Sequence, residues 1–272
     1  MTTVADQAQN LRKSTVIPDA VVPPSLPAVA ITGGKGGVGK TCIAVNLALM
    51  LARLGKKPLL VDCDLSLANA DVLLGLNPTT TLYEVLTGAA PLAGAIVEGP
   101  NGMGFLPAAS GRDELTRLSQ SQLDLLTRGL GIIGKGYDML VIDTPAGIGR
   151  EVMALLRASR VVLVVVTPEP TSLADAYALI KVLESGDPGR DIRIVINQAM
   201  HQDEAVQTFT RLRQVVQTYL HRDLTLAGTM PRDRAVSDAV RNRKPFALGP
   251  DGVALQAIRA LGMRMKAENW KG

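Results

Sequence analysis

A glycine-rich loop between a predicted strand and a predicted helix contains the residues of this chain best suited to chemistry. It runs Gly33-Gly34-Lys35-Gly36-Gly37-Val38-Gly39-Lys40-Thr41 and fits the phosphate-loop pattern G-x-x-x-x-G-K-[ST]. Glycines let backbone N–H groups surround phosphate oxygens, and the following helix adds the positive end of its dipole. We expect Lys40 to reach the β- and γ-phosphates of a nucleotide and the Thr41 hydroxyl to bind Mg²⁺. The predicted phosphate-binding residues are Gly34, Gly36, Gly37, Val38, Gly39, Lys40, Thr41 and Cys42.

Three carboxylates follow predicted strands. Asp62 and Asp64 come directly after the apolar residues 58–61, and Asp143 ends the apolar run 139–142. An acid at the end of a buried strand, in a domain with a phosphate loop, forms a Walker B pattern that places Asp143 near Mg²⁺. Asp62 and Asp64 could hold waters of the metal or position an attacking water, although acidic residues also cap loops. Gly147 would let the loop after Asp143 respond to the γ-phosphate.

Residues that could contact the base follow two later strands. Asn197 comes after residues 192–196 and could hydrogen-bond adenine, while Pro231, Arg232 and Asp233 could wall the base pocket. Asn and Pro are also common turn residues, so this interpretation has a structural alternative. No Asn-Lys-x-Asp guanine motif follows a predicted strand, which favours ATP.

Alternating strands and helices must position these residues. Strand-like runs cover residues 28–32, 58–61, 102–107, 139–142, 161–166, 192–196 and 224–230, and residues 120–133 form one of the helical patterns between them. This order predicts an α/β fold, a single domain with a mostly parallel central sheet and helices on both faces. Loops after the strands would share the carboxyl edge of the sheet, where open α/β folds bind ligands. We expect residues 1–27 to form a short helix and a Pro-rich linker, and residues 28–272 to form the nucleotide-binding domain.

Composition excludes several other classes. Aromatic residues make up 3% of the chain, too few for base-stacking platforms, and the two cysteines and two histidines lack metal or redox spacing. No apolar run suits a signal peptide or a membrane span, so we expect a cytoplasmic location. The net charge of +4 is mild. A solvated helix face is favoured over DNA binding for the basic residues Arg232, Arg234, Arg241, Arg243 and Lys244.

The segment from Lys35 to Thr41 resembles the deviant Walker A motif of the MinD/ParA ATPases. This resemblance implies ATP and Mg²⁺ as cofactors and a homodimer that forms on ATP binding. It also implies three catalytic residues, Lys35, Lys40 and Asp64. Of these, Lys35 would act on the nucleotide bound by the partner copy. Asp64 would orient the attacking water. Thr41 and Asp143 would hold the metal, and Asp62 would support its water shell. The residues that would contact adenine are Asn197, Pro231, Arg232 and Asp233.

Three further stretches, residues 67–76, 106–111 and 167–181, look like the FlhG (FleN) family of ATPases, which limits flagellar number. An N-terminal element of that family docks on FlhF, a GTPase of the signal-recognition-particle type, and stimulates GTP hydrolysis. Its pattern D-Q-A-x-x-L-R is matched by Asp6, Gln7, Ala8, Leu11 and Arg12. The resemblance implies a slow ATPase that switches flagellar placement, with a flagellar transcription factor or a switch-complex protein as a further partner. ParA-like partitioning and MinD-like control of division sites are the alternatives.

Three departures from the family pattern matter. Ser66 replaces a usual glycine, Pro145 is closer to MinD, and the sequence ends soon after a helical pattern at residues 252–271. Related proteins carry a terminal amphipathic helix that binds membrane. The apolar stripe of Ala254, Ile258, Leu261 and Met265 fits either packing on the sheet or contact with the inner face of the cell membrane, and basic residues with Trp270 follow it.

Overall fold

A computed structural model describes residues 26–65, 69–108 and 118–268. The strands are β1 (Leu26–Thr32), β2 (Pro58–Asp62), β3 (Val97–Glu98), β4 (Gly104–Leu106), β5 (Met139–Asp143), β6 (Ser159–Val166), β7 (Asp191–Ala199) and β8 (Thr225–Pro231). The α-helices are α2 (Lys40–Arg53), α3 (Ala70–Leu74), α4 (Leu82–Leu86), α5 (Gln120–Ile133), α6 (Arg150–Ala158), α7 (Pro170–Gly186), α8 (Gln202–Leu220), α9 (Arg234–Arg241) and α10 (Val253–Lys266). Short 3₁₀ turns are η1 (Leu92–Ala95), η2 (Pro100–Gly102), η4 (Gly134–Gly136) and η5 (Phe246–Leu248).

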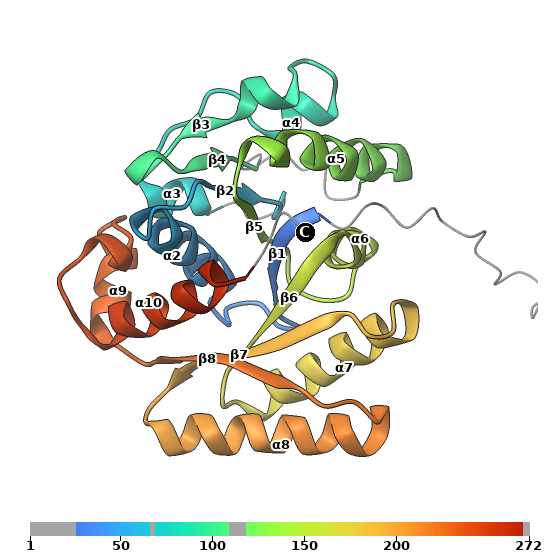
Figure 1. Cartoon of the computed structure of the whole chain (residues 1–272), viewed down its shortest axis with the longest axis vertical. Helices are drawn as coiled ribbons and strands as arrows, with labels where there is room; N and C mark the ends of the chain where they lie inside the picture. The colour runs from blue at the N-terminus through green and yellow to red at the C-terminus, as the bar shows by residue number, and fades with distance from the viewer. Residues whose placement is uncertain (1–25, 66–68, 109–117, 269–272) are drawn as a thin grey trace, which may run out of the picture.

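One twisted sheet runs through the molecule in the strand order β3-β4-β2-β5-β1-β6-β7-β8 (Figure 1). Every pairing is parallel except that of β3 with β4 at the edge. Parallel neighbours place the ends of β1, β2 and β5 side by side, and the phosphate loop and the predicted carboxylates follow those ends. The structure confirms the predicted single-domain α/β fold.

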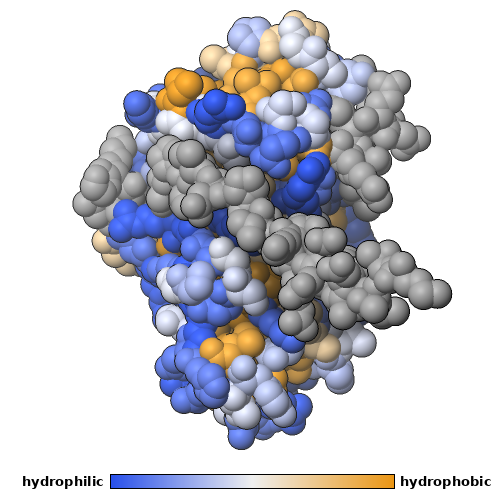
Figure 2. All heavy atoms as spheres, turned by 90° about the vertical axis from the view of Figure 1, so that its right-hand side faces the viewer, coloured by the Kyte–Doolittle hydropathy of each residue, from blue (hydrophilic) through white to orange (hydrophobic). Residues whose placement is uncertain are grey.

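Both faces of the sheet are buried, as a parallel sheet requires. Successive residues of β1 alternate between two apolar cores: Ala28 and Ala30 belong to one, and Val29 and Ile31 to the other. Helices α4 to α8 cover the first core, and α2, α3 and α10 cover the second (Figure 1). The face with α5 and α7 is largely hydrophilic, with separate hydrophobic areas (Figure 2). Burial on both sides explains why the strand sequences are nearly continuous apolar runs.

Helix α10 packs into the core through the stripe that the sequence singled out. Ala254, Ile258, Leu261 and Met265 are buried, and the helix lies against α2 and β8. A Cβ atom at Gly262 would lie 2.9 Å from Cγ of Met50 on α2, so the two helices approach closely there. Of the two interpretations of this stripe, packing on the core is the one observed. No helix in the described part of the chain is both long enough and apolar enough to span a bilayer.

Two details differ from the sequence predictions. Strand β1 begins at Leu26, so Leu26 and Pro27 belong to the domain and not to the predicted linker. Pro27 lies where the pairing of β1 with β6 shifts register between Leu26 and Val29, a bulge that tolerates a residue without an N–H group. The antiparallel edge strand β3 was not predicted, because two residues carry no periodic pattern.

Candidate functional site

The phosphate loop connects β1 to α2 at the carboxyl edge of the sheet. Gly37 and Gly39 have positive φ angles of 79° and 96°, which glycine adopts without steric cost. A Cβ atom at Gly34 would lie 2.4 Å from the backbone carbonyl of Asp175, so this glycine also lets α7 approach the loop. The loop therefore has the local conformation that its sequence predicts and is supported from outside by α7.

Lys40 begins α2 and is buried, with 8% of its surface exposed. Burial lowers the pKa of its ammonium, and the nearby carboxylates of Asp143 and Asp64 oppose that shift. A buried cation at the start of a helix, beside a loop of backbone N–H groups, creates a strongly electropositive site. Phosphate oxygens are the ligands that such a site suits.

Asp62 and Asp143 occupy paired positions at the ends of β2 and β5. Both carboxylates are buried, with 1% of each residue exposed. Asp62 accepts hydrogen bonds from the backbone N–H groups of Asp64, at 3.0 Å, and Ala70, at 3.3 Å. Burial, and then the charge of Asp143, raise the pKa of Asp62, while these N–H groups lower it. The Asp62 carboxylate thus holds both ends of the loop that contains Asp64.

Asp143 differs from Asp62 in its hydrogen bonding, because neither of its buried carboxylate oxygens has a hydrogen-bond partner of ordinary geometry. Burial raises the pKa of this carboxyl to about 7, although the Thr41 hydroxyl and the Lys40 charge both favour the ionised form. An unpartnered buried carboxylate is costly unless a ligand satisfies it.

The donor set fits Mg²⁺, which binds one or two protein oxygens together with substrate phosphates and waters. Asp143 and the Thr41 hydroxyl supply such oxygens beside the phosphate loop. Among residues 26–65, 69–108 and 118–268, His, Cys, Asp and Glu side chains form no cluster of three that could hold a metal without a substrate. The arrangement therefore suits a metal that arrives with a nucleotide.

Lys35 points toward the start of α7. Its Nζ atom lies 2.7 Å from the Glu169 carboxylate, with which it forms an ion pair, and 3.1 Å from the Thr171 hydroxyl. The Lys35 and Glu169 side chains are 41% and 62% exposed. Lys35 is thus held at the surface, apart from the buried Lys40.

A cavity of about 460 Å³ adjoins the phosphate loop. Its lining includes Gly39, Cys42, Asn197, Pro231, Arg232 and Asp233, which brings all the residues predicted to contact adenine together with the loop. Burial raises the pKa of the Cys42 thiol to about 11, so this thiol is neutral at physiological pH. The cavity is apolar enough, and wide enough, to accept a nucleotide base.

Residues around this cavity form hydrogen bonds with other parts of the domain, and most of these bonds were not indicated by the sequence. The Asp233 carboxylate caps two helices: it accepts hydrogen bonds from the N–H groups of Ala235 in α9, at 2.9 Å, and of Ala254 in α10, at 3.2 Å. The Asn197 amide donates to the Val38 carbonyl of the phosphate loop at 2.7 Å. Arg232 donates through its backbone N–H to Ala199 at 2.8 Å. Apart from the cap of α9, which joins residues two positions apart, these contacts involve residues far apart in the sequence, where no local pattern indicates them.

The loop after β5 touches the phosphate loop directly. The Gly147 N–H donates to the Gly33 carbonyl at 3.1 Å, and the Thr144 hydroxyl donates to the Ile31 carbonyl at 3.0 Å. Gly147 has a positive φ of 94°. The loop of residues 144–149 is therefore hydrogen-bonded to the end of β1 and to the start of the phosphate loop.

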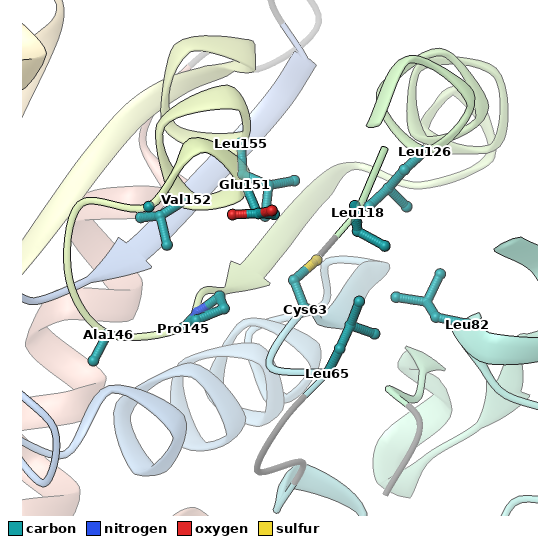
Figure 3. A pocket seen from close by; sticks show the side chains of 11 residues that line it. Cys63, Leu65, Leu82, Leu118, Leu126, Pro145, Ala146, Glu151, Val152 and Leu155 are labelled. Carbon is teal, nitrogen blue, oxygen red and sulfur yellow. The ribbon is translucent and has the colours of Figure 1, made fainter. Parts of the chain in front are cut away.

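A smaller apolar cavity, of about 130 Å³, lies between the loop of residues 144–149 and the segment after β2 (Figure 3). Cys63 and Leu65 come from the segment after β2, and Pro145 and Ala146 come from the loop after β5. Leu82 of α4, Leu126 of α5 and Val152 of α6 close the other sides. Both segments therefore line the same apolar cavity. This cavity lies outside the residues that the sequence predicted for the site.

Some residues that the sequence analysis singled out lie outside the described part of the chain. They are Ser66, Trp270 and the N-terminal docking residues Asp6, Gln7, Ala8, Leu11 and Arg12.

A family model described as an AAA domain matches residues 27–188. The antiactivator FleN of Pseudomonas aeruginosa is 42% identical over 243 residues, which cover 89% of this chain and 86% of FleN. The flagellum site-determining protein YlxH of Helicobacter pylori is 34% identical, covering 85% of this chain and 78% of YlxH.

Solved structures of MinD resemble the whole domain. MinD in the MinC:MinD complex of Aquifex aeolicus superposes with a TM-score of 0.73 at 29% identity, covering 89% of this chain and 96% of the other. MinD of Pyrococcus horikoshii, solved with Mg-ADP, gives a TM-score of 0.71 at 25% identity, covering 88% and 96%. Sequence and fold thus point to the same group of nucleotide-binding proteins.

Proposed function

This chain belongs to the FlhG (FleN) family of MinD/ParA-type ATPases, and from that premise we propose that it is an ATP-dependent switch controlling the number or placement of flagella. The family is one of ATP-binding P-loop proteins, and its flagellar members include an antiactivator and a site-determining protein. The observation that carries the enzymatic part is the buried Asp143 carboxylate, unpartnered beside Lys40 and Thr41.

Each residue of the site has a proposed role. The loop N–H groups and Lys40 bind the β- and γ-phosphates, and the base enters the cavity beside Asn197 and Pro231. Thr41 and Asp143 would hold Mg²⁺, which neutralises phosphate charge when bound. Asp64 orients the attacking water, and Asp62 keeps the Asp64 backbone in place through its hydrogen bond at 3.0 Å.

Hydrolysis is proposed to require two copies of the chain. In one copy, the exposed Lys35 ammonium is paired with Glu169 and lies apart from Lys40. We propose that dimerisation on ATP moves Lys35 to the partner's nucleotide, where a second cation stabilises the charge that develops on the transferred phosphoryl group. The Cys63–Leu65 and 144–149 segments, which share an apolar cavity, would then adopt a shape that partners recognise.

An N-terminal partner completes the proposal. Residues 1–13 would dock on an FlhF-type GTPase and stimulate it through Gln7, with residues 14–25 as the connection to the domain. A flagellar transcription factor or a switch-complex protein is the further partner proposed, and the cytoplasm, including the inner face of the cell membrane, is the proposed site of action.

The test has a biochemical and a cellular part. Purified chain should hydrolyse ATP with a rate per molecule that rises with protein concentration, and Lys40→Ala should abolish nucleotide binding. Deleting the gene should give extra or misplaced flagella, counted by electron microscopy, on cells of normal length. Normal flagellation with minicells, filaments or anucleate cells would instead favour division-site control or partitioning.

A further inference from the structure

Two consecutive side chains at the end of β7 hold the phosphate loop from outside. The Asn197 amide nitrogen donates to the Val38 carbonyl at 2.7 Å, and the Gln198 amide nitrogen donates to the Gly37 carbonyl at 3.4 Å. Residues next to each other in a strand normally point to opposite sides, so two neighbours reaching one loop requires a break in the strand.

That break is a bulge centred on Gln198. The pairing of β7 with β8 passes from Asn197–Met230 to Ala199–Pro231, which leaves Gln198 as the extra residue. Gln198 has φ of 62°, a left-handed conformation that is uncommon and unfavourable for a residue other than glycine. Bulges near binding sites redirect side chains, and here the bulge directs the Gln198 amide to the loop.

The contact with Asn197 is close. A Cβ atom at Gly39 would lie 2.3 Å from the Asn197 amide nitrogen, so only glycine fits at that position of the loop. The phosphate loop is thus shaped on one side by the residue that closes the base cavity.

Holding a carbonyl also orients a neighbouring N–H group. The chain has no cis peptide bond in its described part, and in a trans peptide the C=O and N–H of one unit point in opposite directions. Fixing the Val38 and Gly37 carbonyls toward β7 therefore turns the Gly39 and Val38 N–H groups away from β7. These are N–H groups that a phosphate loop offers to phosphate oxygens.

We propose that Asn197 and Gln198 are positioning residues for the phosphates, because they hold the loop carbonyls. Asn197 would have this role in addition to its proposed contact with the base. The inference rests on the proposed nucleotide-binding function and extends it to a pair of amides that set loop geometry before a nucleotide arrives. Preorganised N–H groups bind an anion without first paying the entropy of ordering the loop.

The deciding probe is inorganic tripolyphosphate with Mg²⁺, which has no base. Binding of tripolyphosphate and of ATP is measured by calorimetry on the full chain and on Asn197→Ala, Gln198→Ala and Gln198→Gly variants. We expect every variant to weaken tripolyphosphate binding by about threefold to tenfold, the effect of one lost hydrogen bond. The Gln198 variants should weaken ATP binding by the same factor, whereas Asn197→Ala should weaken ATP binding by more, because that variant also loses the proposed contact with the base. Gln207→Ala, which removes an exposed glutamine of α8, is the matched control and should bind both compounds as the parent chain does.

Two outcomes overturn the proposal. Weaker ATP binding with unchanged tripolyphosphate binding would make Asn197 a base contact alone. Full affinity in Gln198→Gly, which lacks the amide but accommodates the left-handed backbone, would remove Gln198 from the mechanism.

A second measurement tests the role of Asn197 in ordering the loop independently of whether the chain binds a nucleotide. Hydrogen exchange of the Val38 and Gly39 amides in the nucleotide-free chain should accelerate in Asn197→Ala and stay unchanged in Gln207→Ala. If the parent chain bound neither compound, the proposed nucleotide binding would fail, while this exchange result would still decide whether the Asn197 side chain orders the loop.

Discussion

The Lys35 ammonium and the Glu169 carboxylate, 134 positions apart in the chain, lie 2.7 Å from each other at the surface beside the phosphate loop. Both side chains are substantially exposed, so solvent screens their attraction and the pair adds little to stability. A weak, exposed pair can be exchanged for a stronger contact when another charged group arrives. The Lys35 ammonium is therefore available for the role in a second copy of the chain that is proposed above.

The first prediction concerns Lys35→Ala. The free energy of unfolding should change by less than about 1 kcal/mol, because exposed ion pairs contribute little. Nucleotide binding should persist, whereas ATP hydrolysis should fall by roughly a hundredfold or more, as when a charge-stabilising cation is lost. Thermal unfolding, nucleotide titration and a phosphate-release assay measure the three quantities. Loss of binding together with hydrolysis would place Lys35 in its own subunit's pocket.

Local patterns explain how much of this site could be predicted from the sequence. The phosphate loop is a contiguous motif, and β2, β5 and β7 are apolar runs with polar residues at their ends, so Lys40, Asp143 and Asn197 could be placed at one edge of the sheet. The Glu169 partner of Lys35 and the Gln198 bulge depend on how distant elements pack. The double cap by Asp233 does so too, because α10 begins about twenty positions later in the chain. Such contacts have no spacing rule and require the tertiary structure.

The second prediction concerns the pH dependence of stability without nucleotide or metal. The unfolded Asp143 carboxyl titrates near its ordinary pKa of about 4, and burial raises the folded value to about 7. Between these values the folded chain keeps a proton that the unfolded chain has released, so the free energy of unfolding falls as the pH rises through this window. Chemical denaturation from pH 4.5 to 7.5 should show the decline.

Asp143→Asn is the matched variant for that experiment. The amide cannot ionise, so the decline with pH should become shallower, and at pH 7.5 the variant should be at least as stable as the parent chain. Mg²⁺-dependent ATP binding should nevertheless be lost. A variant less stable than the parent at pH 7.5 would show that the Asp143 carboxylate is satisfied in the folded chain.

The third prediction concerns Asp64→Ala. If Asp64 orients the attacking water, its loss should lower hydrolysis by roughly a hundredfold or more and leave ATP bound. The ATP-bound dimer should then accumulate, measured by light scattering after size-exclusion chromatography with saturating Mg-ATP. Lys40→Ala, which should bind no nucleotide, is the monomeric control. A monomeric Asp64→Ala chain under these conditions would contradict the coupling of ATP binding to dimerisation.

The fourth prediction concerns the N-terminal element. A synthetic peptide of residues 1–13 should stimulate GTP turnover by an FlhF-type GTPase, and the same peptide with Gln7→Ala should not. Leu11→Ala should weaken stimulation less completely, since we expect Leu11 to contribute an apolar contact that anchors the segment, whereas stimulation is proposed to act through Gln7. Unchanged GTP turnover with the unmodified peptide would contradict the proposed docking role of residues 1–13.

The fifth prediction concerns helix α10, whose stripe fitted both core packing and membrane contact. Ile258 is fully buried between α2 and β8, so Ile258→Ala should lower the free energy of unfolding by about 2 to 4 kcal/mol. Met263, on the same helix, is 57% exposed, and Met263→Ala should change the free energy of unfolding by less than about 0.5 kcal/mol. Urea denaturation of both variants compares the two faces of one helix. If instead Ile258→Ala left stability unchanged and reduced sedimentation with anionic lipid vesicles, the stripe would be a membrane-binding surface that leaves the core.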